Sequence, residues 1–439
     1  MLFLSVDFGT SAVKVSVVDG ALTELSTGRA EYPYVLLPGS KVEMRPADLM
    51  GGLYRAMGQL RQDLLGRVEL LCYDAFSPSP VFMKASGDLA YPNIVTHMDR
   101  RSLEQCRYID ETIGRDRYLD IAGLYPFNGG AGIMTVLWVQ HNQPEVLEST
   151  FRIGHLTTYL HHHFTGEWMV DLVNASMLGV YETLSQGGWS EALLRELSLD
   201  PSWFDRICNP GTVLGRLRPQ VSARLGLRSG VPVAVGTNDM AAAQVGAGNV
   251  RPGCIMDTAG SSDMVSILTD RPVVNPRYYL RNSALPGLWQ IYATTAGGFA
   301  LDWFHQQLAR DLTRHQFYEE LVPRAVTEFA QDGLVTFDPY LTGDRQSLEL
   351  RTAAWHGLTL AATREEMLAA MLKSMNRVLS ATVREAAAVV DLEPVIKLTG
   401  GLSTKSFVEL KEREMPGFRF EVVDNCSIMG NVALARRYM

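Results

Sequence analysis

Small and hydroxyl-bearing residues follow an acid near the start of the chain, where Asp7 precedes Gly9, Thr10, Ser11 and Lys14. A glycine in such a turn lets the backbone approach a ligand closely, and the amides and hydroxyls around it can hold phosphate oxygens. A carboxylate at the position of Asp7 can hold Mg²⁺ through water. The pattern indicates a site for nucleotide phosphate, although the same residues also suit an ordinary hairpin turn.

A similar pattern recurs in the second half of the chain. Gly260, Ser261 and Ser262 stand between two strand-like runs, as the first turn does. This internal echo predicts two domains of one design that present their turns to a shared cleft. The pair Gly400-Gly401 stands between a strand and a helix, where a flat group can lie against the backbone, although a plain connection uses the same residues. Gly297-Gly298 also precedes a helical segment.

Asp239 is the candidate general base. It follows the strand-like segment 231–235 after Gly236. Phosphoryl transfer needs held phosphates, a divalent metal and a base near the acceptor hydroxyl, and a carboxylate can receive that proton. Asp239 also suits the N-cap of a helix over 240–245, and both roles are compatible because a carboxylate there stays ionised. With Asp7, it forms the predicted metal-binding pair.

Composition narrows the class of protein. The chain has 439 residues, of which 46% are hydrophobic and 20% charged, and its formal net charge is −8. This length fits two domains, and the acidic balance leaves no basic footprint for nucleic acid. The five cysteines form no CxxC pair and fit a reduced, cytoplasmic setting, and no apolar run is long enough to span a bilayer. The sequence contains neither GxxxxGK[ST] nor, after the first strand, GxGxxG.

Periodicity predicts the elements that must position these residues. The expected strands cover 2–8, 12–19, 68–76, 231–235, 255–258, 264–268 and 395–398, and the expected helices cover 46–65, 240–245, 299–312, 364–390 and a segment from about 406. The methionines of the long helix over 364–390 are expected in the core. The triplet His161–His163 is expected on a helix surface without metal. A boundary near 225–236 divides the chain into domains 1–230 and 231–439.

With its motifs in this order, the chain resembles the FGGY carbohydrate kinases, members of the actin, hexokinase and heat-shock chaperone superfamily. Residues 7–14 are similar to the family's first phosphate motif, 97–101 to its "WxDxR" segment, 236–239 to the segment with its catalytic Asp, 260–262 to its second phosphate motif, 297–304 to its "GGALDWF" stretch, 339–345 to "PYLSGER", 353–372 to its second signature and 400–403 to its adenosine motif. The similarity is collinear over essentially the whole chain.

The resemblance implies an α/β fold of two ribonuclease-H-like, actin-like ATPase domains with a central cleft. It implies that ATP and Mg²⁺ are used, that the sugar binds on the N-terminal side and that ATP binds on the C-terminal side. The implied nucleotide-binding residues are Asp7, Gly9, Thr10, Ser11, Lys14, Gly260, Ser261, Ser262, Gly297, Gly400, Gly401 and Ser403, and the implied substrate-binding residues are Ser77, His97, Asp99, Arg101 and Asp239.

Departures from the family pattern leave the acceptor open. Thr135 stands where lysine is usual, His97 replaces a tryptophan, and residues 76–80 replace the Gln-Met-His of xylulose-type members. Lys373 and Lys405 also depart from the pattern. A ketopentose such as xylulose is the first expectation, with ribulose, gluconate, erythritol or another polyol as alternatives.

Two other classes of protein remain as alternatives to a kinase. The first is a non-catalytic, ATP-binding regulatory protein, which Asp239, Asp99 and Arg101 disfavour because it needs no sugar site. The second is an actin-like filament former, for which the sequence holds no positive signal. The expected partner is a small sugar or polyol, with neither nucleic acid nor membrane, and a homodimer stays open.

Overall fold

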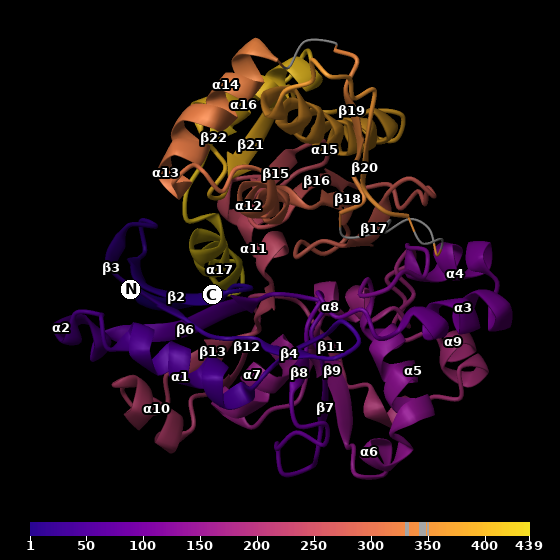
Figure 1. Cartoon of the computed structure of the whole chain (residues 1–439). Helices are drawn as coiled ribbons and strands as arrows, with labels where there is room; N and C mark the ends of the chain where they lie inside the picture. The colour runs from indigo at the N-terminus through magenta and orange to yellow at the C-terminus, as the bar shows by residue number, and fades with distance from the viewer. Residues whose placement is uncertain (330–332, 342–347, 349–350) are drawn as a thin grey trace. The chain divides into compact units, whose positions relative to one another are not determined.

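The computed structural model describes residues 1–329, 333–341, 348 and 351–439 and divides into two compact units. Unit 1 comprises residues 1–250, 280–289 and 425–439, and unit 2 comprises 251–279 and 290–424. Each unit combines a mixed β-sheet with helices (Figure 1), so the α/β class is confirmed. Of the segment that resembles "PYLSGER", residues 342–345 lie outside the described residues.

The division between the units differs from the expected boundary at residue 230. Residues 231–250 belong to unit 1 because strands β13 (Pro232–Ala234) and β14 (Thr237–Asn238) pair with β6 (Val68–Ala75) in the unit 1 sheet. The last helix, α17 (Cys426–Arg436), returns to the same unit and packs against α11 (Asp239–Gly246), as Figure 1 shows. Unit 1 is therefore assembled from stretches that are far apart in the sequence.

The main sheet of unit 1 has the strand order β12-β13-β6-β1-β2-β3, with β14 beside β6. Its other strands are β1 (Leu2–Phe8), β2 (Ala12–Asp19), β3 (Glu24–Glu31) and β12 (Val213–Arg216). The expected hairpin of β1 and β2 is confirmed, and Asp7 lies opposite Lys14 in its register. β6 runs parallel to β1 and places Asp74 beside Asp7. Residues paired across strands project to one face, so these three side chains gather at one place.

The two faces of this sheet are covered differently. Leu4, Val6 and Phe8 point into a large core that also contains the apolar face of α1 (Pro46–Met57). Phe3 points to the opposite face and packs with residues of α17 such as Ile428. The alternation of side chains along β1 thus requires the C-terminal helix to complete the second core.

Two local expectations in unit 1 are wrong. The helix expected over 46–65 is interrupted, because Gly58 ends α1 and a short helix, α2 (Gln62–Leu65), follows. The triplet His161–His163 does lie in a helix, α7 (Leu156–Thr165), but His161 and His162 are buried rather than on the surface. The Nδ1 atom of His161 lies 3.2 Å from the Tyr73 hydroxyl. Burial lowers the pKa of all three imidazoles to about 4.

Smaller sheets and helices complete unit 1. The strands are β4 (Val35–Leu37), β5 (Lys41–Met44), β7 (Pro80–Met83), β8 (Ile94–Val95), β9 (Arg152–His155), β10 (Val170–Asp171) and β11 (Ile207–Cys208). The helices are α3 (Leu103–Thr112), α4 (Arg115–Ala122), α5 (Gly132–Asn142), α6 (Pro144–Glu148), α8 (Leu172–Leu178), α9 (Glu191–Glu196), a 3₁₀ turn (Pro201–Trp203) and α10 (Pro219–Leu225). β17 (Tyr279–Asn282) starts at the last residue of the 251–279 stretch of unit 2 and continues into the 280–289 stretch of unit 1.

Unit 2 repeats the design of a hairpin beside a parallel strand. β15 (Ile255–Ala259) and β16 (Asp263–Thr269) form the expected hairpin, and β21 (Val395–Thr399) runs parallel to β15. The remaining elements are β18 (Trp289–Thr295), β19 (Thr336–Asp338), β20 (Ala354–His356), β22 (Arg419–Val422), α12 (Gly297–Leu308), α13 (Arg314–Gln316), a π-helical turn (Phe317–Leu321), α14 (Val322–Glu328), α15 (Arg364–Ala386) and α16 (Lys405–Glu414). Met371 and Met375 of α15 are buried, as the core reading of its methionines predicts.

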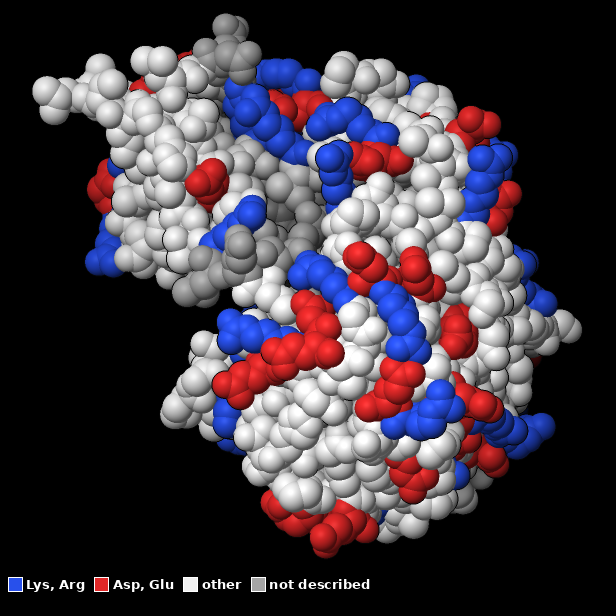
Figure 2. Space-filling view, turned by 90° about the vertical axis from the view of Figure 1, so that its right-hand side faces the viewer, with Lys and Arg blue, Asp and Glu red and all other residues white. Residues whose placement is uncertain are grey.

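The surface carries mixed charge. Figure 2 shows Lys and Arg side chains interspersed with Asp and Glu side chains over the face in view. Within the described ranges, none of the helices has both the length and the apolar character that crossing a lipid bilayer demands.

Candidate functional site

Three carboxylates of unit 1 act on one another. Asp7 and Asp74 are each the last residue but one of their strands, β1 and β6, and Asp239 begins α11. Burial, and then the charge of Asp7, raises the pKa of Asp239 to about 7. Burial and the charges of Asp7 and Asp239 raise the pKa of Asp74 well above its ordinary value. Like charges in a poorly solvated place favour a proton or a cation, which is common at functional sites.

At the start of α11, the helix N-cap and the predicted general base are two different residues, although the sequence allowed Asp239 to be both. Asn238, not Asp239, caps the helix, since its Oδ1 accepts a hydrogen bond of 3.2 Å from the amide of Ala241. Asp239 is the first helical residue, and its Oδ1 accepts hydrogen bonds from the Met240 amide at 2.8 Å and from Asn238 Nδ2 at 2.9 Å. These bonds orient the carboxylate that was predicted to be the base.

A buried polar network holds the segment just before Asp239. Asp171 is fully buried, and it accepts hydrogen bonds from the Thr237 hydroxyl at 3.0 Å and from Asn174 Nδ2 at 2.7 Å. The Oδ1 of Asn174 accepts a hydrogen bond from the hydroxyl of Ser77. The sequence singled out Ser77 and missed Asp171 and Asn174, whose signal was two polar residues inside a buried apolar stretch.

The first glycine turn is oriented by two tyrosines. The carbonyl oxygens of Gly9 and Thr10 accept hydrogen bonds from the hydroxyls of Tyr32 and Tyr34. In a trans peptide the carbonyl and the following N–H point in opposite directions, so the amides of Thr10 and Ser11 point away from the tyrosines. Successive amides that point one way form a site for an anion.

Lys14 is engaged by other side chains of unit 1. Its Nζ donates to the Oδ1 of Asn425 and lies 3.6 Å from a carboxylate oxygen of Glu24. Its charge also counters the effect of burial on the pKa of Asp7, although that pKa stays raised. A direct contact between Lys14 and a nucleotide stays a prediction.

The acids of unit 1 fit part of a magnesium shell. Among the described residues, the Oδ1 atoms of Asp7 and Asp74 are buried without a hydrogen-bond partner. In the same ranges, no group of three or more His, Cys, Asp and Glu side chains is arranged to hold a metal ion. Mg²⁺ commonly takes one or two carboxylates and fills its octahedral shell with water and phosphate oxygens. The residues present are therefore compatible with Mg²⁺ that arrives with a phosphate.

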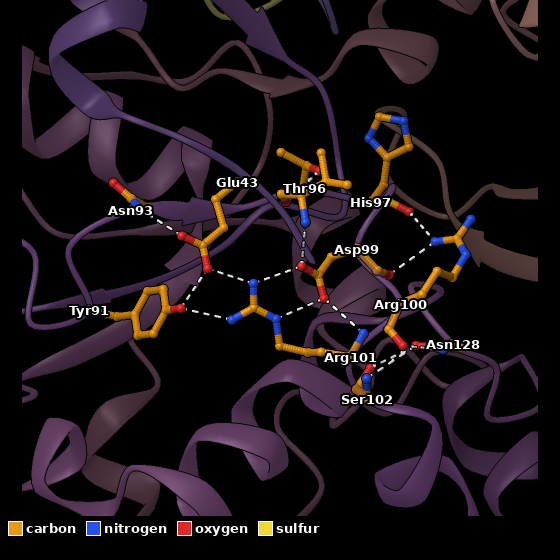
Figure 3. A network of polar contacts seen from close by, with 11 residues as sticks. Glu43, Tyr91, Asn93, Thr96, His97, Asp99, Arg100, Arg101, Ser102 and Asn128 are labelled. Atoms are coloured by element: carbon orange, nitrogen blue, oxygen red, sulfur yellow. Dashed lines mark hydrogen bonds and ion pairs between the residues drawn. The ribbon is translucent and has the colours of Figure 1, made fainter. Parts of the chain in front are cut away.

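The predicted substrate residues Asp99 and Arg101 belong to a buried ionic network (Figure 3). One Nη of Arg101 lies 2.5 Å from the Glu43 carboxylate and 2.7 Å from the Asp99 carboxylate, and the other donates to the Tyr91 hydroxyl at 2.7 Å. Asn93 donates to the second oxygen of Glu43 at 2.7 Å. Burial raises the pKa of Glu43, but the hydrogen bonds from Tyr91, Asn93 and Arg101 outweigh it and hold that pKa below its ordinary value.

This network leaves little of either side chain accessible. The side chains of Arg101 and Asp99 are 1% and 3% exposed. Asp99 also accepts a hydrogen bond of 2.7 Å from the amide of Val42, which ties its loop to β5. His97 is half-buried and lies edge-on to Phe76, with ring centroids 6.0 Å apart. These contacts tie Asp99 and Arg101 into the fold of the loop that carries His97, and their contact with substrate stays a prediction.

In unit 2, glycine turns meet around a cavity of about 620 Å³. The amide of Gly298 donates to the carbonyl of Gly260 at 2.9 Å, and the amide of Leu402 donates to the carbonyl of Ala259 at 2.9 Å. Gly400 has a φ of +107°, and a Cβ there would lie 2.4 Å from the Ala259 oxygen. Only glycine allows this close approach of the two turns.

The predicted nucleotide residues of unit 2 divide into two groups. Gly260, Ser261 and Gly401 line the cavity. The others support the turns: the Ser403 hydroxyl, for example, donates to the carbonyl of Gly400 at 2.7 Å, and Gly297 packs against the backbone of Ser262 and Asp263.

The sequence missed the polar wall of this cavity. Asp302, Arg314 and Tyr318 all line it. The Tyr318 hydroxyl donates to Asp302 at 2.8 Å, and Arg314 lies 3.1 Å from the same carboxylate. The four-residue spacing of Arg314 and Tyr318 on a helical segment was the available signal.

Comparison with known families decides the class of protein. Residues 2–246 match the model of the N-terminal domain of the FGGY family of carbohydrate kinases. The chain belongs to this family. It is a carbohydrate kinase, and the family expected from the motifs is confirmed.

The relatives of this kinase are named for different substrates. It is 24% identical over 351 residues to the xylulose kinase of Lactococcus lactis subsp. lactis (strain IL1403), covering 78% of this chain and 68% of that relative. It is 21% identical over 385 residues to the gluconokinase of Bacillus subtilis (strain 168), covering 85% of this chain and 74% of that relative. These names leave the acceptor of this kinase unsettled.

Solved structures share its fold. The ligand-bound xylulose kinase from Lactobacillus acidophilus superposes with a TM-score of 0.86 at 18% identity, over 100% of this chain and 89% of that chain. The gluconate kinase from Lactobacillus acidophilus gives a TM-score of 0.87 at 18% identity, over 100% and 89%. Two actin-like ATPase domains of α/β architecture, as expected from the resemblance, are thus the fold of this chain.

Proposed function

We propose that this kinase transfers the γ-phosphate of ATP, with Mg²⁺, to a hydroxyl of a small sugar, with a ketopentose such as xylulose as the first acceptor to test. The carboxylate cluster around Asp239 carries the proposal, since it provides a base and a place for a cation. The glycine-lined cavity of unit 2 supports it as a site for the nucleotide. Similarity to xylulose kinases supports the choice of acceptor.

Asp239 receives the proton of the acceptor hydroxyl as its oxygen attacks the γ-phosphorus. The hydrogen bonds to its Oδ1 hold the carboxylate in one orientation, which supplies much of the rate in such a step. A pKa of about 7 lies close to a neutral working pH, where a base of this kind accepts a proton most effectively. Excluding water from this step limits wasteful hydrolysis of ATP.

In this proposal the glycine turns bind the phosphates, and the neighbouring acids bind the metal. The amides of Thr10 and Ser11, together with Gly260 and Ser261, bind phosphate oxygens. Asp7, whose Oδ1 has no hydrogen-bond partner among the described residues, and Asp239 would hold Mg²⁺ directly or through its water shell. When bound, the metal would neutralise charge on the phosphates. Gly400, Gly401 and Ser403 border the adenosine. Ser77, His97, Asp99 and Arg101 shape the acceptor pocket.

Gluconate is a second candidate acceptor because of a buried arginine in unit 1. Arg281 is 2% exposed, and its charge acts on Asp239 by lowering the pKa that burial and Asp7 raise. A planar guanidinium near the base matches the carboxylate of a sugar acid better than a neutral ketose. Arg281→Met would then reduce kcat/KM for gluconate more than that for xylulose.

An ADP-release assay with a panel of acceptors tests the proposal. The panel contains pentuloses, hexuloses, aldonates and polyols at equal concentration, with a no-acceptor control for ATP hydrolysis. We expect the highest kcat/KM for a ketopentose. We also expect the activity to require Mg²⁺ and to be lost when EDTA is added. A rate that no acceptor raises above the hydrolysis control would favour a regulatory ATP-binding protein instead.

A further inference from the structure

A lysine is completely buried in unit 2 between two buried acids. The Nζ atom of Lys411 lies 2.8 Å from the Oδ2 of Asp257 and 2.8 Å from the Oδ2 of Asp263. The side chains of Lys411 and Asp257 are 0% exposed, and that of Asp263 is 3% exposed. Burying three charges is costly even when they are paired, and apolar side chains of the same volume often serve stability as well or better. The role of this triad therefore lies in what it holds together.

The two acids flank the turn that was predicted to bind phosphate. Asp257 lies in β15, and Asp263 begins β16 directly after Ser262. Asp263 pairs with Ala259 across the hairpin, and Asp257 is two residues from Ala259 on the same strand. Side chains at such positions project to one face of the sheet. Both carboxylates thus lie on the same side of the hairpin, next to its glycine turn.

The lysine belongs to the helix that forms another wall of the cavity. Thr404, at the N-cap of α16, and Phe407 line the cavity. Phe407 and Lys411 are four residues apart and so lie on one face of the helix. The face of α16 that borders the cavity is therefore the face that Lys411 anchors to the hairpin.

We propose that Lys411 is a positioning residue for the nucleotide, which fixes the phosphate turn 260–262 relative to the cavity-lining face of α16. This rests on the proposed function, since it takes the cavity as the nucleotide site. The two turns already touch through the backbone at Ala259 and Leu402, so a small displacement of the hairpin changes both walls at once. Without the ammonium, Asp257 and Asp263 repel each other and take up water, and the turn moves.

Lys411→Met in the full chain tests the proposal. We expect the Kd for ADP, measured by calorimetry without acceptor, and the KM for ATP to rise at least tenfold, while the KM for the acceptor changes less than twofold. The matched control is Lys397→Met, which removes a partly exposed lysine of the same unit that pairs with Glu421 at 2.6 Å. This control should leave both constants at the wild-type values.

A second variant tests whether weaker ADP binding comes from the lost positioning of the turn or from the destabilising effect of unpaired buried acids. The triple variant Asp257→Asn, Asp263→Asn, Lys411→Met removes every charge of the triad and leaves no acid unpaired. We expect this variant to fold, with a thermal transition like that of the wild type, and still to bind ADP at least tenfold more weakly. Wild-type affinity for ADP in either folded variant would overturn the proposal.

Gly401→Val distinguishes failure of this proposal from failure of the assigned nucleotide site. Among the described residues, a Cβ on Gly401 meets no heavy atom within 4 Å, so a valine β-carbon fits there, next to the cavity that Gly401 lines. If Gly401→Val loses ADP while the Lys411 variants keep it, the site stands and the role of Lys411 is refuted. If all of these variants bind ADP normally, the nucleotide binds elsewhere, and both the assigned nucleotide site and the proposed role of Lys411 are refuted.

Discussion

At the scale of single residues, Asp239 is the proposed general base, and its buried charge also lowers the stability of the folded protein. Its charge is opposed by burial and by Asp7, so the folded protein holds a proton there more tightly than the unfolded chain does. Active sites commonly keep such unfavourable groups because the reaction needs them. Two predictions separate the chemical role of Asp239 from its cost.

Replacing Asp239 by asparagine should abolish most of the transfer. Asparagine keeps the shape and an oxygen acceptor but cannot take the proton, so we expect kcat to fall by about 10²–10⁴-fold. The measurement is ADP release with the best acceptor at saturating ATP. Calorimetric ADP binding at the wild-type affinity shows that the variant is folded. Near-normal turnover in Asp239→Asn would show that another group is the base.

The same substitution should raise stability at high pH. The pKa of Asp239 is raised from 3.8 to about 7 on folding, so ionisation disfavours the native state at every pH above that range. In metal-free buffer we expect Asp239→Asn to be more stable than the wild type at pH 8, by up to a few kcal/mol at roughly 1.4 kcal/mol per pKa unit. The difference should shrink as the pH falls through about 7 and vanish near 4. Thermal melts from pH 4 to 8 measure it, and a pH-independent difference contradicts the assignment.

At the scale of elements, the glycine turns of unit 2 act as one packed assembly. Gly260 accepts a hydrogen bond from Gly298, and Gly400 packs against Ala259. Turns that depend on one another in this way position the amides at the ends of strands more rigidly than isolated loops do.

Gly260→Val should weaken nucleotide binding selectively. The nearest described atom to a Cβ on Gly260 is the Ser262 oxygen at 3.7 Å, which is an ordinary contact, so the variant should fold. Because Gly260 lines the cavity, the added methyls occupy space that the nucleotide needs. We expect the KM for ATP to rise at least tenfold and the KM for sugar to change little. The reverse pattern in steady-state kinetics would move the nucleotide site elsewhere.

The ionic network of unit 1 predicts a large loss of stability in Arg101→Met. The substitution leaves Glu43 and Asp99 buried without their shared partner, and breaking a buried pair in this way costs about 3–5 kcal/mol. Urea denaturation measures the free energy of unfolding. The control is Arg61→Met, whose exposed pair with Asp63 contributes at most about 1 kcal/mol. Equal effects of the two substitutions would refute the structural role of Arg101.

At the scale of the whole molecule, unit 1 is completed by the end of the chain. Asn431 of α17 donates to Asp74 at 2.6 Å, and the Ser5 hydroxyl donates to the carbonyl of Ile428 at 2.9 Å. The helix also covers apolar side chains of the sheet, such as Phe3 and Cys72. The C-terminal residues therefore contribute both to the core and to the surroundings of the carboxylate cluster.

Deleting residues 425–439 should destabilise the protein. The deletion exposes the second apolar face of the sheet and removes the partner of Asp74, so we expect aggregation or a thermal transition lowered by several degrees. The control deletes only Tyr438 and Met439, which are 40% and 59% exposed and follow α17. Differential scanning calorimetry and light scattering compare the two. An unchanged melting temperature in the longer deletion contradicts this role of α17.

The sequence predicted features whose causes are local. Alternating residues predicted the hairpins of β1–β2 and β15–β16, and hydroxyl residues beside glycine marked the turns that join them. The motif order predicted the family and thereby the fold. A boundary near residue 230 followed from the same local reasoning and missed that β13 and β14 pair with β6.

Only the tertiary structure revealed which distant residues share a site. Parallel pairing places Asp74, which lies in the strand expected over 68–76, beside Asp7, and packing buries Lys411 of α16 between Asp257 and Asp263. The physical reason is that periodicity and turn chemistry depend on neighbours a few positions away. Strand register and helix packing instead join residues hundreds of positions apart, and those contacts decide which charges are buried and paired.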